Sequence, residues 1–367
     1  MKVLHLIATG DAGGVQTLIK EYASLSELDN IYTFAWGGGF NEENMRNHGA
    51  RTICFDAHQD GTFRTGLKLV SLFIKEKPGA VVVHTSPFLR YTASWMHRID
   101  RTVRVYFYCH ADIRFQVDIY RGLKKAVYNY INRLCIRHCE KVIAISQYVK
   151  RTMMEFYHVS ADRIEVIYNA ANVEAFNVPI HVPLETVRFV YTGRLVEEKG
   201  VQISLQALAR LPGQISWEFH IVGEGPFGST LEKLADELGI GRKVIFHGSC
   251  SNIPDILAEM DIFLHTCIWE EGFGIGIIEA MAAGKLCICS HSGAIPEIIH
   301  DGIDGFLVEK NNTEQLTECL MKVLDRKEDW EPIRQAARKT AGQYNVGKFA
   351  ETLDRLLGQP EEKLYLK

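Results

Sequence analysis

The chain has 367 residues, of which 47% are hydrophobic and 23% charged, and its formal net charge is −4. At about 150 residues per domain this length predicts two domains, and the composition is typical of a globular protein with a full core. Fibrous, low-complexity and intrinsically disordered proteins are excluded. No apolar run approaches the ~20 residues that a membrane-spanning helix needs.

Charge is distributed unevenly along the chain. Residues 90–151 contain 13 Lys and Arg against 4 Asp and Glu, a local balance of +9, whereas the remaining residues carry −13. Such segregation predicts an anionic partner on one face of one domain. The nine cysteines include no Cys-x-x-Cys pair, and the first apolar segment is too short for a signal peptide, so we expect free thiols in the cytoplasm.

In the first half of the chain, short apolar runs alternate with longer amphipathic segments. The expected strands are Val3–Ala8, Ile31–Ala35, Thr52–Phe55, Ala80–His84, Val103–Cys109, Val142–Ile145 and Ile164–Ile167. The helices expected between them include Gln16–Ser26, Arg64–Glu76, Asp118–His138 and, capped by Ser146, Gln147–Tyr157. This alternation predicts right-handed βαβ units and a parallel sheet.

A second series of the same kind follows residues 173–186, which contain two prolines and little periodicity. Its expected strands are Val187–Thr192, Trp217–Val222, Lys243–His247, Asp261–His265, Leu286–Ser290 and Phe306–Val308. Its expected helices are Gly200–Leu211, Gly228–Leu238, Ile275–Ala283, Glu314–Leu324 and Lys348–Leu357. We therefore expect two doubly wound α/β domains, 1–172 and 187–345, joined by a linker at 173–186 and followed by a tail at 346–367. Ligands of such sheets bind beyond the carboxyl ends of the strands, which predicts a site in a cleft between the domains.

Two loops at expected strand ends suit an anionic ligand. The first contains Gly13 and Gly14 ahead of a helix, where the backbone can approach an anion, although a plain tight turn explains it as well. The second contains Gly193, Arg194 and Lys199 between a buried strand and a helix. Two cations at a helix start suit a diphosphate, and the alternative is pairing with neighbouring glutamates in a solvated loop.

In the stretch from Trp269 to Gly284, the carboxylates of Glu271 and Glu279 are eight residues apart. Glu271 lies in a glycine-rich turn, and Glu279 lies near the middle of an otherwise apolar helix. A lone carboxylate is costly to bury without partners, so its presence indicates a ligand or a salt bridge. Carboxylates are good acceptors for sugar and ribose hydroxyls, and the structural alternative is a Glu279–Arg194 ion pair.

Together these motifs resemble the retaining nucleotide-sugar glycosyltransferases of family 4, in particular those of bacterial surface-polysaccharide synthesis. The resemblance covers nearly the whole chain. Its pieces are Gly13-Gly14, Gly193-Arg194 with Glu198-Lys199-Gly200, the segment Val222–Pro226, Glu271-Gly272-Phe273-Gly274 with Glu279, and Gly293 with Pro296-Glu297. It implies the GT-B fold, in which two Rossmann-like domains face each other across a cleft and a C-terminal helix returns to the N-terminal domain.

The resemblance also implies roles for individual residues. Arg194 and Lys199 would hold the donor diphosphate, and Glu279 would bind the ribose hydroxyls. Glu271 would contact the transferred sugar, and His110 would lie near the donor sugar and the acceptor. The donor would also be contacted by Gly13, Gly14, Gly193, Gly272, Phe273 and Gly274. Taken without the family, a histidine at a strand end is more often structural.

The sequence contains no Asp-x-Asp triplet, the motif with which other transferases hold a cation on the diphosphate. Because Arg194 and Lys199 can take the part of that cation, we expect no metal and no other cofactor. A zinc site at Cys135, His138 and Cys139 is a weak alternative, since no second ligand pair is evident.

The basic region predicts a membrane-docking face. The helix expected at 118–138 carries cations among apolar residues, namely Arg121, Lys124, Lys125, Arg133 and Arg137. We expect this face to bind anionic lipid at the inner surface of the cell membrane and to admit a polyprenyl-diphosphate-linked or other glycan acceptor. The alternative is an ordinary amphipathic helix with a solvated basic face, and no recognised motif supports nucleic-acid binding.

The leading functional hypothesis is a hexosyltransferase that moves a sugar from a nucleotide-sugar, expected to be a UDP-sugar, to a hydroxyl group in capsule or exopolysaccharide synthesis. One alternative is a nucleotide-sugar epimerase or hydrolase on the same fold. The other is a noncatalytic protein that binds a nucleotide-sugar and associates with the membrane.

Overall fold

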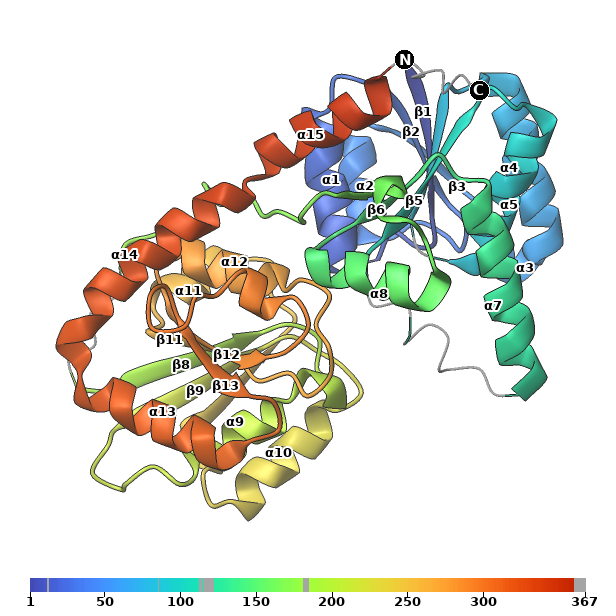
Figure 1. The fold of residues 1–367 in the computed structure, drawn as a ribbon. Helices are drawn as coiled ribbons and strands as arrows, with labels where there is room; N and C mark the ends of the chain where they lie inside the picture. Colours follow the sequence, from blue (N-terminus) through green and yellow to red (C-terminus); the bar gives the residue numbers. More distant parts are fainter. Residues whose placement is uncertain (12, 85, 112–113, 115–121, 181–184, 360–367) are drawn as a thin grey trace. The chain divides into compact units, whose positions relative to one another are not determined.

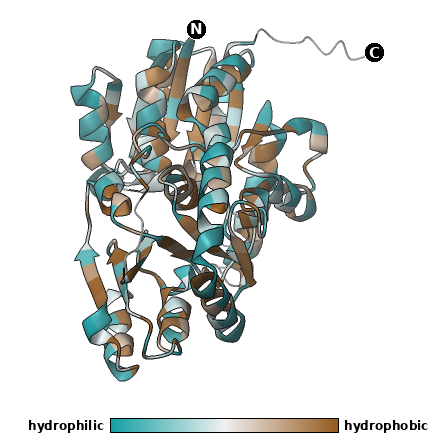
Figure 2. Ribbon diagram, turned by 90° about the vertical axis from the view of Figure 1, so that its left-hand side faces the viewer, coloured by the Kyte–Doolittle hydropathy of each residue, from teal (hydrophilic) through white to brown (hydrophobic). Residues whose placement is uncertain are grey.

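Apolar, β-branched runs form the strands of two separate parallel sheets (Figure 1). The computed structural model describes residues 1–367 except 12, 85, 112–113, 115–121, 181–184 and 360–367. The chain divides into one unit that begins at Met1, ends at Asn169 and resumes at Val346, and a second unit spanning Ala170–Asn345. Figure 2 shows apolar residues concentrated on the strands and both residue types on the helices, as expected for sheets covered on both faces.

The sheet of the first unit has the strand order β3-β2-β1-β4-β5-β6-β7. Its strands are β1 Lys2–Ile7, β2 Asp29–Phe34, β3 Arg51–Cys54, β4 Ala80–His84, β5 Arg104–Cys109, β6 Lys141–Ala144 and β7 Ile164–Val166. All seven correspond to expected strands, and the strand order reverses between β1 and β4. The carboxyl ends of β1, β4 and β5 therefore lie side by side at the switch point, where open α/β sheets bind ligands.

The helices of this unit pack on both faces of the sheet. They are α1 Gly14–Leu25, α2 Phe40–Asn47, α3 Ala57–Asp60, α4 Thr62–Glu76, α5 Pro87–Ile99, α7 Gly122–Arg137, α8 Gln147–Tyr157 and α15 Val346–Gly358. The expected cap is present, because the Ser146 hydroxyl accepts a hydrogen bond from the Val149 N–H at 3.1 Å. The expected helix 118–138 begins at Gly122 in the described part of the chain, and its first four residues lie outside it.

The sheet of the second unit has the order β10-β9-β8-β11-β12-β13. Its strands are β8 Val187–Thr192, β9 Trp217–Val222, β10 Val244–Gly248, β11 Ile262–His265, β12 Leu286–His291 and β13 Phe306–Glu309. Its helices are α9 Val201–Leu208, α10 Gly228–Glu237, α11 Ile253–Ala258, α12 Ile275–Ala282, α13 Thr313–Asp325 and α14 Trp330–Ala341. Helix α14 was not expected. Its buried positions recur at helical spacing, but Arg334 among them is charged and Ala337 and Ala341 are small, so the sequence does not single them out as a core face.

The division between the units lies ahead of the expected linker. Ala171 forms a bridge with Asn345, and the Arg338 guanidinium donates a hydrogen bond to the Val178 carbonyl, so residues 170–180 belong with the second unit. The prolines of the expected linker, Pro179 and Pro183, indicate irregular chain. Composition alone does not distinguish irregular chain that packs on a domain from a segment that connects two domains.

The last helix, α15, packs against α1 of the first unit (Figure 1). The rings of Tyr22 and Phe349 meet edge to face with centroids 6.0 Å apart, and the Tyr22 hydroxyl donates to the Asp354 carboxylate at 2.5 Å. Leu353 is only 1% exposed in this contact. The first unit is thus completed by the last described helix of the chain.

Replacing Leu353 with Ala should therefore destabilise the first unit by about 2–5 kcal/mol, the usual cost of truncating a fully buried leucine. Differential scanning calorimetry should show one of the unfolding transitions moving to lower temperature. Glu351→Ala on the exposed face of the same helix is the matched control and should leave the transition in place. An equal, negligible effect of both changes would show that α15 does not stabilise the first unit.

Candidate active site

The carboxyl end of the second sheet is built from loops that are fixed to one another by backbone hydrogen bonds. The loop after β8 is fixed to the loop after β9, because the Gly193 N–H donates to the Val222 carbonyl and the Leu195 N–H to the Glu224 carbonyl, both at 2.9 Å. Further along, the Ile268 N–H donates to the Glu198 carbonyl at 3.0 Å. The residues that follow β8 are thereby held against those that follow β11, the neighbouring strand.

Two glycines permit this close packing. Gly200 has a φ of 70°, and a Cβ there would overlap the carbonyl oxygen of Thr266. Gly293 has a φ of 54°, and a Cβ there would overlap the backbone of Glu271. Both positions therefore need glycine for conformation and for space, since other residues rarely adopt positive φ.

Glu271 is the centre of the polar contacts at this edge. Its Oε2 atom lies 2.5 Å from Lys199 Nζ and 3.1 Å from His265 Nε2. Lys199 comes from the loop after β8, and His265 is the last residue of β11. The structure thus brings together two of the predicted catalytic residues and adds a histidine that the sequence analysis did not assign to the site.

The charges of this cluster stabilise one another. Burial alone would raise the pKa of Glu271, but the Lys199 ammonium and the hydrogen bond from His265 hold it well below its usual range. Burial alone would likewise lower the pKa of Lys199, and the Glu271 charge raises it instead. Burial lowers the pKa of His265 despite the neighbouring carboxylate. At neutral pH the cluster is an ion pair that receives a hydrogen bond from a neutral imidazole.

Arg194 and Glu279 are predicted site residues of the second unit whose side chains have no partner in the described part of the chain. Arg194 is exposed. Its backbone carbonyl accepts hydrogen bonds from the Tyr191 hydroxyl and the Val196 N–H, both at 3.1 Å, and its guanidinium makes no hydrogen bond to the described residues. Glu279 is half-buried on α12, and burial raises the pKa of its carboxyl to about 7. The alternative interpretation of a structural Arg194–Glu279 ion pair, and that of Arg194 paired with adjacent glutamates, both fail.

Helix α12 begins beside the end of β8. A Cβ placed at Gly276 would lie 3.3 Å from the Thr192 hydroxyl, one residue before Gly193. Glu279 lies three residues after Gly276 and hence on the same face of the helix. Gly272 and Phe273 are buried in the turn that leads to this helix, and the Phe273 ring packs edge-on against Tyr344. The remaining residue of the predicted turn, Gly274, is the N-cap of α12 with a φ of 107°.

The donor set here does not favour a metal ion. His265, Cys267 and Glu271 place their potential ligand atoms within 4.8 Å of one another. However, the Glu271 carboxylate already forms an ion pair with Lys199. Burial also raises the pKa of the Cys267 thiol to about 12, so this thiol stays protonated. Cysteine binds a metal ion as the thiolate, so a protonated Cys267 is a poor third ligand.

The remaining predicted site residues belong to the first unit. Gly13 and Gly14 are exposed at the start of α1, directly after β1. His110 follows β5 and is only 8% exposed. On α7, Lys124, Arg133 and Arg137 are exposed and Lys125 is half-buried, whereas Arg121 lies outside the described residues. Cys135 on this helix and Cys139, two residues after its end, are buried free thiols, and burial raises the pKa of each.

His265 could have been found from the sequence by one signal. It ends a buried apolar strand, as His110 follows one, and polar residues at such ends face the ligand-binding edge of a parallel sheet.

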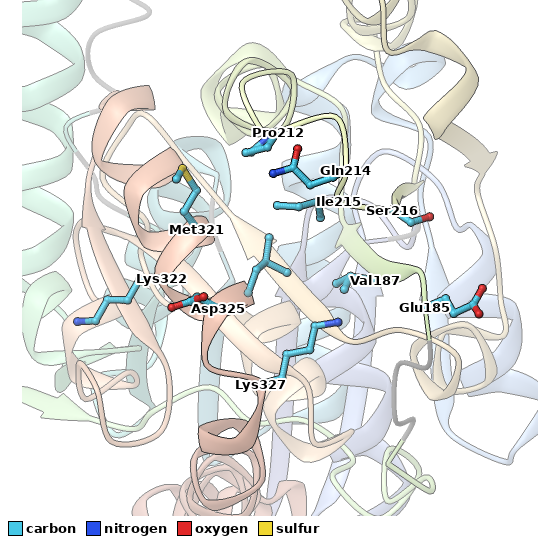
Figure 3. Close-up of a pocket in the computed structure, with 11 residues that line it drawn as sticks. Glu185, Val187, Pro212, Gln214, Ile215, Ser216, Met321, Lys322, Asp325 and Lys327 are labelled. Atoms are coloured by element: carbon cyan, nitrogen blue, oxygen red, sulfur yellow. The ribbon is translucent and has the colours of Figure 1, made fainter.

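A separate pocket of the second unit, drawn in Figure 3, lies around Val187 at the opposite, amino-terminal end of β8. Its lining contains none of the predicted site residues.

The raised pKa of Glu279 predicts a pH-dependent stability. The folded protein keeps the proton on Glu279 up to pH about 7, whereas the unfolded chain releases it near the ordinary glutamate pKa of 4.5, so wild-type stability falls as the pH rises through this window. Glu279→Gln should therefore raise the melting temperature of the unliganded protein by a few degrees at pH 8. The gain should disappear below pH about 4.5, where the wild-type carboxyl is also neutral.

The matched control for this change is Glu318→Gln at an exposed position of α13. It should leave the melting temperature unchanged at every pH. A wild type and a Glu279→Gln variant with equal melting temperatures at pH 8 would show that the Glu279 carboxylate is not destabilising.

Comparison with known families matches both halves of the chain. Residues 13–175 match Glycosyltransferase Family 4, and residues 174–340 match Glycosyl transferases group 1. The chain is 26% identical to an uncharacterised 41.2 kDa protein in the cps region of Klebsiella pneumoniae, over 87% of this chain and 89% of that one. It is 23% identical to the UDP-Gal:alpha-D-GlcNAc-diphosphoundecaprenol alpha-1,3-galactosyltransferase of Escherichia coli, over 97% and 96%.

Other matches cover less of each relative. The chain spans 51%, 37% and 52% of three curated relatives, among them the N-acetyl-alpha-D-glucosaminyl L-malate synthase of Bacillus anthracis, which is 32% identical over 142 residues. The solved structures include Anabaena Alr3699/HepE in complex with UDP, which has a TM-score of 0.84 at 20% identity and covers 98% of this chain and 100% of that one.

A second solved structure has the same architecture. The lipopolysaccharide outer core galactosyltransferase WaaB has a TM-score of 0.77 at 20% identity, covering 98% of this chain and 99% of that one. The structural similarities show the fold. The two family matches show that the sequence of each half also resembles glycosyltransferases. With its two parallel-sheet units, the chain belongs to the family 4 glycosyltransferases of the GT-B fold.

Proposed function

We propose that this protein transfers a sugar, with retention of anomeric configuration, from a UDP-sugar to a hydroxyl group of a glycan or lipid-linked acceptor in surface-polysaccharide or capsule synthesis. The observation that carries the proposal is the Arg194 guanidinium, which lies in the same loop as Lys199 and has no partner among the described residues. The same strand edge presents the half-buried carboxylate of Glu279, which also has no partner in that part of the chain. The UDP complex of the HepE structure and the galactosyltransferase relatives support the choice of donor and pathway.

The reaction needs cations beside the leaving diphosphate. When the bond between the anomeric carbon and the diphosphate oxygen breaks, negative charge grows on that oxygen and positive charge on the sugar ring. Arg194 supplies a guanidinium that no carboxylate of the described residues engages, and Lys199 is held in place by its ion pair with Glu271. Cations already in place stabilise the transition state more than the ground state. The proposed reaction therefore needs no divalent metal.

The two glutamates have different parts in this proposal. Glu279 is half-buried and lacks a protein partner among the described residues, so its oxygens can accept hydrogen bonds from the two ribose hydroxyls. Glu271 Oε2 is shared by Lys199 and His265, and the other oxygen of this carboxylate is the proposed contact to the transferred sugar. Ribose binding would repay the cost of desolvating the Glu279 carboxylate.

Arg194→Ala should lower kcat/KM by about 10²–10³-fold, because removing one transition-state charge partner costs about 2–4 kcal/mol. Steady-state assays of UDP release with a glycan acceptor measure this. Arg210→Ala, which removes an exposed arginine after α9, is the matched control and should keep full activity. A wild-type rate in Arg194→Ala would refute the assigned role.

Product analysis separates the alternatives. Release of free sugar or of an epimer without formation of an acceptor glycoside would favour a hydrolase or an epimerase. Unchanged biological function in Arg194→Ala would favour a noncatalytic nucleotide-sugar-binding protein. Formation of an acceptor glycoside by the wild type, lost in the variant, supports the transferase.

We also propose that the first unit docks on the cytoplasmic surface of the cell membrane. No helix in the described chain has the length and apolarity to cross a bilayer. However, two adjacent helices expose apolar stripes at helical spacing: Tyr91, Trp95 and Ile99 on α5, and Leu123, Val127 and Tyr130 on α7. Leu123 is 80% exposed. Apolar residues that are exposed together in this way, rather than singly, mark an interaction surface.

The charge of these helices is complementary to anionic lipid. Lys124 and Arg133 alternate with the apolar stripe of α7, and no acidic residue occurs in this helix. Apolar side chains can enter the headgroup region while the cations contact lipid phosphates. This surface would bring the enzyme to a polyprenyl-diphosphate-linked acceptor.

Lys124→Ser together with Arg133→Ser should weaken binding to phosphatidylglycerol-containing vesicles by roughly thirtyfold, because each cation contributes about 1 kcal/mol near an anionic surface. Co-sedimentation measures the partition. Lys322→Ser with Lys327→Ser, two exposed lysines of the second unit, is the matched control. Binding that is indifferent to the fraction of anionic lipid would contradict docking.

A further inference from the structure

Three buried histidines lie in a row across the central strands of the first sheet. His5 is in β1, His84 ends β4 and His110 follows β5. In the strand register His5 lies opposite Val82, and His84 lies opposite Tyr108. His84 is two residues after Val82, the register partner of His5, and His110 is two residues after Tyr108, the register partner of His84. Because side chains two residues apart on a strand point to the same face, all three histidines lie on one face of the sheet, and the row approaches its carboxyl edge.

Hydrogen bonds join the three rings. His5 Nδ1 lies 3.1 Å from His84 Nε2, and His84 Nδ1 lies 2.9 Å from His110 Nε2. A neutral imidazole has one donor and one acceptor nitrogen, so the protons in such a row must all point in one direction or all in the other. The atom at the far end of the row decides which.

That end is anchored by a carboxylate on the last helix. Asp354 Oδ1 accepts from the Ser26 hydroxyl at 2.7 Å, and Ser26 Oγ accepts from Asn30 Nδ2, also at 2.7 Å. An ionised carboxylate cannot donate, so the Ser26 proton points to Asp354 and the Asn30 amide nitrogen donates to Ser26. The Asn30 carbonyl oxygen is then the acceptor that faces His5 Nε2 at 3.0 Å.

The direction propagates along the row. His5 must donate from Nε2, which leaves its Nδ1 to accept from His84 Nε2–H. His84 Nδ1 then accepts from His110 Nε2–H. The last nitrogen, His110 Nδ1, is left as a bare acceptor, and it is a buried atom without a hydrogen-bond partner among the described residues. An unsatisfied buried acceptor at a ligand-binding edge indicates a donor that arrives with a ligand.

We propose that the chain from Asp354 through His5 and His84 sets the tautomer of His110, so that His110 Nδ1 accepts a hydrogen bond from a hydroxyl group of the carbohydrate substrate. His5, His84 and Asn30 are positioning residues in this arrangement. The identity of the hydroxyl as one on a transferase substrate rests on the proposed function, whereas the tautomer assignment rests on the hydrogen bonds alone.

The surroundings keep the row neutral. Burial lowers the pKa of His5 to about 4 and that of His110 to about 3, and it lowers the pKa of His84 well below its usual range. His110 is additionally stacked on Tyr108, with ring centroids 4.2 Å apart. A nitrogen of such low basicity accepts a hydrogen bond but does not take a proton at neutral pH, so His110 orients a hydroxyl group rather than acting as a general base.

Two variants of His84 separate positioning from packing. In His84→Gln the amide can donate to His5 and accept from His110, which preserves the direction of the row. In His84→Leu both contacts are lost and the tautomer of His110 is no longer imposed. The matched control is His247→Leu, because His247 forms a similar pair with His220 in the second unit, at 2.9 Å.

The first measurement is long-range ¹H–¹⁵N NMR of protein labelled at histidine, which distinguishes protonated from unprotonated ring nitrogens. We expect an unprotonated Nδ1 on His110 in the wild type, in His84→Gln and in His247→Leu, and a mixture of tautomers in His84→Leu. A protonated Nδ1 on His110 in the wild type overturns the proposal, whether or not the His84→Leu variant folds.

The second measurement is kcat/KM for sugar transfer. Loss of one hydrogen bond to a substrate hydroxyl should lower it about tenfold in His84→Leu, with His84→Gln retaining most of the activity and His247→Leu all of it. Equal losses in His84→Gln and His84→Leu would overturn the substrate contact. A wild type that transfers no sugar while His110 keeps its Nε2–H tautomer refutes the proposed reaction and supports the tautomer assignment.

Discussion

The ion pair between Lys199 and Glu271 organises the edge of the second sheet. It joins the loop after β8 to the turn before α12, and the imidazole of His265 donates to the same carboxylate oxygen. Burying a carboxylate is tolerated here because the cation and the hydrogen-bond donor compensate the lost hydration. With Lys199 committed to Glu271, Arg194 is the cation of this loop that has no protein partner in the described chain.

Glu279 shows the opposite balance. Its carboxyl lies in a mostly apolar helix, and desolvation by burial raises its pKa. A residue that lowers the stability of the unliganded fold is expected where a ligand supplies the missing partners. Glu271 has protein partners that compensate its lost hydration, whereas Glu279, eight residues later, has none among the described residues. We therefore assign Glu271 a structural part in the site and Glu279 a part in binding substrate.

The first unit depends on the end of the chain as much as on its beginning. Helix α15 supplies buried apolar residues to α1, and its Asp354 carboxylate accepts hydrogen bonds from both Tyr22 and Ser26. The same carboxylate determines the direction of the hydrogen bonds that end at His110. A surface helix thereby influences a nitrogen at the ligand-binding edge through hydrogen bonds alone.

The sequence by itself determined the strands of both sheets, since apolar β-branched runs between turn residues are local signals, and its spaced motifs identified Arg194, Lys199, Glu271 and Glu279. It did not reveal helix α14, whose buried face includes a charged residue and alanines, or the attachment of residues 170–180 to the second unit. The tertiary structure alone decided that Lys199 pairs with Glu271, that His265 joins them, and that His5, His84 and His110 form one row. The physical reason is that side-chain periodicity follows from neighbouring residues. The hydrogen bonds within the row and between Lys199 and Glu271 instead join residues 25 to 79 positions apart, which strand order and register bring together.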